Sequence, residues 1–210
     1  MSTPYASNYP HAHTSTDSGL TRTMWAIAIV WFALNVALGV SGFLSEHPGL
    51  NRTFVLGSPI AFAVAFAVSP RVRAWAFAFD TRTLVTAQTV RVGGIAFLAV
   101  YAVGQLDGRF ALWAGGLDCA VGFSALFAGY YLTPPRTTRQ RTLLIAWMVP
   151  GILDFLVAIP LAAMARLADP ASVSALTRPP LSMIIAFFVP LALIDYFVIG
   201  AHLWRPRERA

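Results

Sequence analysis

Four ionisable residues lie inside stretches of the chain that are otherwise apolar: Arg91, Asp118, Asp154 and Asp195. Each would cost about 2.5–3.5 kcal/mol at the centre of a bilayer, so such groups are normally paired, hydrated or functional. One arginine can neutralise only one of the three acids, and the other two must be protonated, hydrogen-bonded or in contact with cavity water. This excess of acid favours a path for protons, a cation or a small polar solute. The alternative is a buried polar cluster that fixes the register of the helices.

Depth along the helices predicts which acid meets the arginine. At a rise of about 1.5 Å per residue, Arg91 and Asp195 both lie about 12 to 13 Å from the ends of their apolar stretches. Equal depth predicts that these two residues pair, with Asp154 as the next candidate. Asn35, near the middle of the first stretch, and Gln88, on the face of Arg91, also need partners in the bundle. A single polar intramembrane cluster is therefore predicted, with six members: Arg91, Asp118, Asp154, Asp195, Asn35 and Gln88.

The fourth stretch, residues 110–132, places that acid on a face of small residues. Positions three or four apart lie on one face of a helix. On this face Asp118 is accompanied only by glycine and alanine: Ala111, Gly115, Gly122, Ala125 and Gly129. Small faces let neighbouring membrane helices approach closely. The stretch is therefore predicted to form a central helix that carries Asp118 inward.

The composition is typical of a polytopic membrane protein. Of 210 residues, 57% are hydrophobic and 11% are charged, the mean hydropathy is +0.65, and the apolar residues form long runs. All 15 basic residues are arginine, so a retinal protein, which needs a lysine Schiff base, is excluded. All of these arginines except Arg91 flank the apolar runs, so the basic net charge does not indicate nucleic-acid binding. The predicted partner is the lipid bilayer.

Six apolar stretches are long enough to cross a bilayer as helices, which predicts an all-α fold with six transmembrane helices. They cover residues 23–44, 53–69, 84–105, 110–132, 142–165 and 181–203. Residues 1–20 are predicted to form a disordered polar tail, residues 21–204 the transmembrane bundle, and residues 205–210 a short basic tail. Residues 71–79 either lie at the membrane interface or prolong the second helix.

The placement of arginines predicts the orientation in the membrane. Ten flanking arginines lie on the side of the two termini and four lie on the other side, while Arg91 lies inside. Cytoplasmic loops are enriched in positive charge. Both termini are therefore predicted to be cytoplasmic.

A run of positions in the last two-thirds of the chain resembles small uncharacterised bacterial membrane proteins. The run consists of Arg91, Gly94, Phe110, Ala111, Ala114, Gly115, Gly116, Asp118, Gly122, Asp154, Phe188, Val189, Pro190 and Leu191. The resemblance implies a bacterial cytoplasmic (inner) membrane and no particular chemistry.

Neither a cofactor nor a metal is predicted. The apolar stretches contain a single histidine, His202, whereas a haem held by two histidines needs a second one. The chain also carries no phosphate-binding loop and no zinc motif.

The sequence leaves three functions open. The first is a small transporter or ion-linked permeation protein, which a water-filled cavity touching the acids would favour. The second is a non-catalytic accessory or assembly subunit, which a dry core with Arg91 bridging two acids would favour. The third is a lipid-modifying enzyme, which a lateral opening with a polar floor would favour. The small-residue face also allows a homodimer or a membrane partner subunit.

Overall fold

The computed structural model describes residues 18–205 and contains six helices long and apolar enough to cross a membrane. They are α1 (Ser18–Val40), α3 (Gly49–Val68), the composite helix α5–η1–α6 (Thr81–Ala87, Gln88–Gly94 and Ile95–Ala102), α7 (Gly108–Leu132), α8 (Thr138–Ala168) and the composite helix α9–η3–α10 (Leu181–Met183, Ile184–Phe188 and Val189–Trp204). Shorter helices connect them: α2 (Phe43–Glu46), α4 (Pro70–Ala78) and η2 (Pro170–Thr177). The predicted all-α fold with six transmembrane helices is confirmed.

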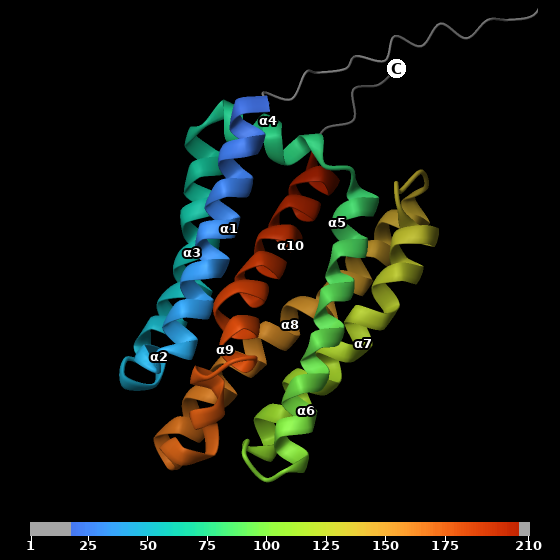
Figure 1. Cartoon of the computed structure of the whole chain (residues 1–210). Helices are drawn as coiled ribbons and strands as arrows, with labels where there is room; N and C mark the ends of the chain where they lie inside the picture. Colours follow the sequence, from blue (N-terminus) through green and yellow to red (C-terminus); the bar gives the residue numbers. More distant parts are fainter. Residues whose placement is uncertain (1–17, 206–210) are drawn as a thin grey trace, which may run out of the picture.

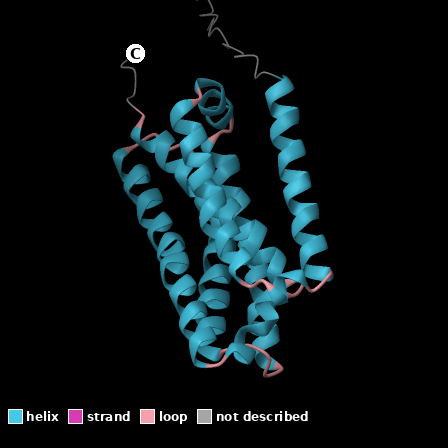
Figure 2. Cartoon of the chain, turned by 90° about the vertical axis from the view of Figure 1, so that its left-hand side faces the viewer, coloured by secondary structure: helices cyan, strands magenta, loops and turns pink. Residues whose placement is uncertain are grey.

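The helices form one bundle, and both described ends of the chain lie on the same side of it (Figure 1). Helix α1 stands at one edge of the bundle (Figure 2), and its buried residues are Asn35 and Gly39. Because α1 begins at Ser18, residues 18–20 of the predicted polar tail are helical. The rest of the two predicted tails, residues 1–17 and 206–210, lies outside the described residues.

Polar caps fix where the helices that carry the ionisable residues begin. Asp80 caps α5 and Asp107 caps α7, because each carboxylate accepts a hydrogen bond from a backbone N–H of the first turn at 2.9 Å. Thr137 and Gln140 form a capping box at the start of α8. Asp80 precedes its membrane-spanning helix, and hydrogen bonds from the side chain and backbone of Thr83 lower the pKa of its carboxyl.

Residues 70–78 form the separate helix α4. Ser69 has an extended backbone between α3 and α4, with φ −109° and ψ 108°. Its hydroxyl accepts a hydrogen bond from the backbone nitrogen of Val72, and Pro70 occupies the first turn, where its missing N–H is tolerated. A direct prolongation of the second transmembrane helix, which the sequence left open, is therefore excluded.

Helix α7 carries the small-residue face into the interior of the bundle. All five small residues of that face are buried: Ala111, Gly115, Gly122, Ala125 and Gly129. At Gly122 a Cβ would lie 2.6 Å from the backbone nitrogen of Val92, closer than real Cβ atoms approach other atoms. The absence of a side chain there is what allows α7 to pack directly against the backbone of η1.

Two membrane-spanning helices change geometry partway along. Gln88–Gly94 form the 3₁₀ segment η1, and Ile184–Phe188 form the π-helical segment η3. Pro190 follows η3 and has no N–H for the carbonyl of Ala186, so the wider π turn accommodates its ring. Irregular turns inside helices often mark functional sites, and η1 carries Arg91.

Candidate functional site

The centre of the bundle contains an ion cluster formed by Arg91, Asp118 and Asp154. Arg91 Nε donates a hydrogen bond to Asp118 Oδ1 at 2.6 Å, and Arg91 Nη2 donates to Asp154 Oδ2 at 2.5 Å. The three residues are buried, with exposed fractions of 5%, 4% and 1%. The guanidinium from η1 thus bridges one carboxylate from α7 and one from α8. These are the two salt bridges found within residues 18–205.

Further contacts from α8 and α10 hold the guanidinium in place. Arg91 Nη1 donates to the carbonyl oxygen of Gly151 at 3.1 Å and to the hydroxyl of Tyr196 at 2.9 Å. The guanidinium carbon also lies 4.4 Å from the centroid of the Phe155 ring, within cation–π range. A Cβ at position 151 would overlap the Tyr196 hydroxyl, so glycine is required for this arrangement.

The ion cluster contains one acid more than it can neutralise, because two carboxylates share a single guanidinium. Among the described residues, Asp154 Oδ1 is buried and has no hydrogen-bond partner. A buried carboxylate oxygen needs a proton, a water molecule or a ligand to offset the loss of hydration. Asp154 Oδ1 can receive one, and the Asp154 carboxyl lies close enough to that of Asp118 for a hydrogen bond between the two groups when one is protonated.

The pairing of Arg91 with Asp195, predicted from equal depth, is wrong. Gln88 Nε2 is the hydrogen-bond donor near Asp195, at 3.5 Å from its Oδ2, and it also donates to the carbonyl oxygen of Ala192 at 3.3 Å. Depth gives the height of a residue on its helix but not the face it occupies. Consecutive residues of a helix are rotated by about 100°, so Asp195 and Tyr196 lie on different faces of α10. Tyr196 is the residue that faces Arg91.

Asn35 is buried but forms no bond with the ion cluster among the described residues. Its Nδ2 donates to the carbonyl oxygen of Trp31 within α1 at 2.8 Å, and its Oδ1 has no partner there. The structure thus joins Asp118 and Asp154 through Arg91. It links Gln88 to Asp195 separately, and it leaves Asn35 bonded within its own helix.

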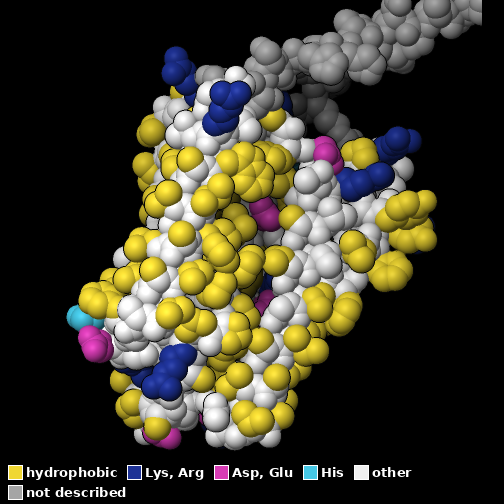
Figure 3. Space-filling model, in the orientation of Figure 1, with side chains coloured by type: hydrophobic (Ala, Val, Ile, Leu, Met, Phe, Trp, Pro, Cys, Tyr) yellow, Lys and Arg dark blue, Asp and Glu magenta, His cyan; other side chains and the backbone are white. Residues whose placement is uncertain are grey.

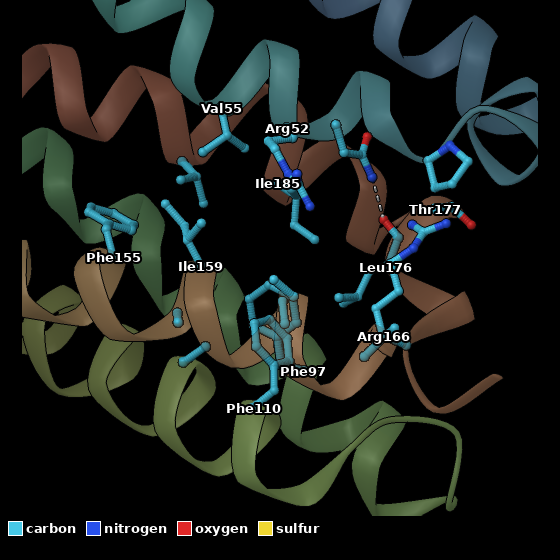
Figure 4. A pocket seen from close by; sticks show the side chains of 18 of the residues that line it. Arg52, Val55, Phe97, Phe110, Phe155, Ile159, Arg166, Leu176, Thr177 and Ile185 are labelled. Atoms are coloured by element: carbon cyan, nitrogen blue, oxygen red, sulfur yellow. Dashed lines mark hydrogen bonds between the residues drawn. The ribbon is translucent and has the colours of Figure 1, made fainter. Parts of the chain in front are cut away.

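A cavity of about 140 Å³ lies between the ion cluster and the end of the bundle opposite the described ends of the chain. Figure 4 shows side chains that line it, among them Arg52, Phe97, Phe110 and Arg166. Asp118 and Asp154 line its inner end, halfway along their helices. Arg52, near the start of α3, and Arg166, near the end of α8, line its mouth. The walls between these two ends are apolar and include Val55, Phe97, Phe110, Ala158, Ile159 and Ile185.

A second hollow, which we call the side crevice, opens between η1 and the composite helix α9–η3–α10. It has a volume of about 270 Å³, and Arg91, Asp118, Gly94, Ile184 and Phe188 are among its lining residues. Figure 3 shows acidic side chains at the bottom of a hollow in the apolar surface between α10 and α5. Because Asp118 lines both the cavity and the side crevice, the ion cluster lies between the two spaces.

The residues around Arg91 that the sequence did not predict are Gly151, Phe155 and Tyr196. A signal for two of them was present, because Asp154 and Asp195 are each followed directly by an aromatic residue. In both pairs the aromatic residue contacts the guanidinium. The arginines at the cavity mouth were interpreted only as flanking charges. Within residues 18–205, no three His, Cys, Asp or Glu side chains come together as metal ligands would.

The fold and the site define a multi-pass α-helical integral membrane protein with a buried arginine–aspartate cluster. Residues 50–203 match the domain of unknown function DUF8737, and the chain belongs to that family. The match covers α3 to α10 and excludes α1 and α2. No curated protein and no solved structure was found to match the chain.

Proposed function

We propose that the protein is a small proton-linked transporter in which the ion cluster closes the inner end of the cavity. The observation that carries this proposal is the position of the acids. Asp118 and Asp154 line a cavity that reaches the exposed residues of one end of the bundle, and Asp154 Oδ1 has no partner among the described residues. A buried acid that water can reach from one side is a common element of proton-coupled transport.

Protonation of the ion cluster could open the inner end of the cavity. A proton from water in the cavity would bind Asp154 Oδ1 and remove the excess negative charge. The attraction between this carboxyl group and Arg91 would then weaken, because neutralising one partner removes the charge–charge attraction between them. Movement of the guanidinium would connect the cavity to the side crevice through Asp118. The irregular segments η1 and η3, which both line the side crevice, are the candidate moving parts.

Proton flux into proteoliposomes that contain an internal pH dye tests the proposal. Wild-type protein should carry flux under a pH gradient, and Asp118→Asn and Asp154→Asn should abolish it, because asparagine keeps the shape but cannot ionise. Asp195→Asn is the matched control, since Asp195 does not line the cavity. Wild-type liposomes without flux at any applied gradient would refute transport, as would flux that survives both cavity substitutions.

A structural role as an accessory or assembly subunit is the second candidate. The observation in its favour is that Arg91 forms four hydrogen bonds to residues of α7, α8 and α10. A guanidinium bonded to three helices fixes their register without any movement. This candidate predicts no flux in the wild type and a requirement for Arg91 in stability alone.

The side crevice has the lateral opening expected of a lipid-modifying enzyme. However, the ionised groups at its floor, Arg91 and Asp118, are bonded to each other. The crevice-lining residues that the structure describes include no further acid, base or nucleophile. We therefore do not propose an enzyme.

For the membrane orientation we propose that both termini face the cytoplasm of a bacterial inner membrane. The ten arginines on the terminal side support this, together with the position of both described ends on one side of the bundle. A reporter that works only in the cytoplasm should be active when it is fused after Ala210. A reporter that works only in the periplasm should be inactive at the same position. A periplasmic signal from this fusion would overturn the orientation.

A further inference from the structure

The mouth of the cavity carries two arginine side chains that form no salt bridge with the acids of the described residues. Arg52 and Arg166 are both exposed, and within residues 18–205 neither forms a salt bridge. Figure 4 shows Arg52 reaching from α3 and Arg166 reaching from α8 toward the open space at the mouth. The acids that line the cavity, Asp118 and Asp154, lie at the other end. The mouth therefore presents two guanidinium groups with free donors for an anion.

Below this mouth the cavity is suited to hydrocarbon. Its walls are aliphatic side chains and the rings of Phe97 and Phe110, whose centroids lie 5.4 Å apart in an edge-to-face arrangement. Asp154 and Arg166 lie on the same helix and are separated by twelve residues, or about 18 Å at 1.5 Å per residue. The apolar section thus lies between a cationic mouth and an acidic inner end.

We propose that the cavity binds a single-chain amphiphile with an anionic headgroup, of the chemical class of a long-chain carboxylate. The headgroup would accept hydrogen bonds from Arg52 and Arg166, and the chain would lie between α3, α7 and α8. The cavity volume of about 140 Å³ is room for on the order of ten water molecules, which suits one hydrocarbon chain better than the two of a phospholipid. This inference rests on the proposed function, because it names the class of substrate that the transporter would take.

The sign of the charges makes the two proposals consistent. The negative inner end of the cavity repels an anionic headgroup, so the headgroup stays at the mouth while both acids are ionised. Proton uptake at Asp154 would remove this repulsion and make Arg91 available to an anion. Substrate entry would then depend on the proton.

Binding of tritium-labelled laurate to the protein in phosphatidylcholine nanodiscs tests the inference, with empty nanodiscs subtracted. Laurate should bind saturably, and dodecanol, which has the same chain without the charge, should compete at least about tenfold more weakly. Arg52→Gln and Arg166→Gln should each weaken laurate binding about tenfold, since each removes a charged donor. Arg178→Gln is the matched control, because Arg178 is exposed at the same end of the bundle but does not line the cavity.

A cavity-filling substitution provides an independent measurement. Ala162→Phe projects into the cavity and should abolish laurate binding, whereas Ala120→Phe on the exposed face of α7 should not. Equal binding of laurate and dodecanol would overturn the inference. So would competition by acetate as strong as that of laurate, or equal effects of Arg178→Gln and the two mouth substitutions. Laurate binding without proton flux would refute transport and support this inference, whereas flux without laurate binding would refute this inference alone.

Discussion

Replacing Arg91 by methionine tests whether the ion cluster holds the bundle together. Methionine keeps an unbranched side chain as long as the aliphatic stem of arginine and removes the guanidinium group with its charge. The substitution deletes four hydrogen bonds and leaves two buried carboxylates without a cation. Removal of one partner of a buried ion pair costs about 3–5 kcal/mol, because the other charge stays buried and unpaired. We therefore expect Arg91→Met to lower the free energy of unfolding by about 3–5 kcal/mol.

Double-mutant cycles identify the partners of Arg91. Asp118→Asn and Asp154→Asn each reduce the charge that the missing guanidinium leaves uncompensated. Each should therefore show a coupling energy with Arg91→Met of about 1–3 kcal/mol. Asp195→Asn is the matched control, since it removes an acid of equal depth that forms no bond with Arg91. Its coupling energy should be below about 0.5 kcal/mol.

Reversible unfolding in mixed micelles with increasing dodecyl sulfate, followed by tryptophan fluorescence, gives these free energies. The contacts around Arg91 would be wrongly assigned if Asp195→Asn coupled to Arg91→Met as strongly as the other two substitutions. They would be equally wrong if Asp118→Asn and Asp154→Asn were both strictly additive with Arg91→Met.

Three further substitutions test packing and capping. Gly122→Leu should lower stability by at least about 1–3 kcal/mol, because a side chain there meets the backbone of η1, whereas the exposed Leu126→Phe should be near neutral. Equal thermal unfolding of these two variants in detergent would show that the wrong face of α7 was placed inside. Gly151→Ala should destabilise the fold by displacing the hydroxyl of Tyr196, and Tyr196→Phe should partly rescue it; a double variant less stable than Gly151→Ala would contradict this contact. Asp80→Ala should cost about 1 kcal/mol at neutral pH through the lost cap. The pKa of Asp80 is lowered in the folded state, so its contribution is present above the unfolded-state pKa and is lost as pH falls through the folded-state pKa. The difference in stability between wild type and Asp80→Ala should therefore become smaller as the pH is lowered. A difference that becomes larger would contradict the lowered pKa of Asp80.

The number of helices and the interior face of α7 could be predicted because each depends on one helix at a time. Hydrophobic length locates a membrane span, and the spacing of small residues identifies a face that can pack closely. Irregular backbone was harder to foresee. The 3₁₀ segment at Gln88–Gly94 arises where Gly122 and other small residues bring α7 against it, which is a property of two helices together.

The sequence predicted one polar cluster of six residues, but the structure joins only Arg91, Asp118 and Asp154 in the ion cluster. Asn35, Gln88 and Asp195 lie outside it. Residue type shows that Arg91 must have an acidic partner, but the choice among three acids depends on how each helix is rotated. On α8 the acid Asp154 faces Arg91, whereas on α10 the aromatic Tyr196 does. A rotation of about 100° separates these two outcomes, and neither depth nor composition determines it. The cavity is lined by five membrane spans and by η2, so no local pattern predicts it.

The bond between Arg91 and Asp118 joins consecutive membrane spans, α5–η1–α6 and α7, which are connected by the short segment between Ala102 and Gly108. Both spans have a mean hydropathy of 1.5, against 2.1 and 2.3 for the two spans that follow. A lone helix with a central charge enters a bilayer at a cost of about 2.5–3.5 kcal/mol. Two such helices that leave the translocation machinery as a hairpin carry opposite charges that already neutralise each other. Asp154 enters the membrane later, with α8, and binds Arg91, which is already there. The same contact that organises the mature bundle thus favours insertion of these two spans as a pair during synthesis.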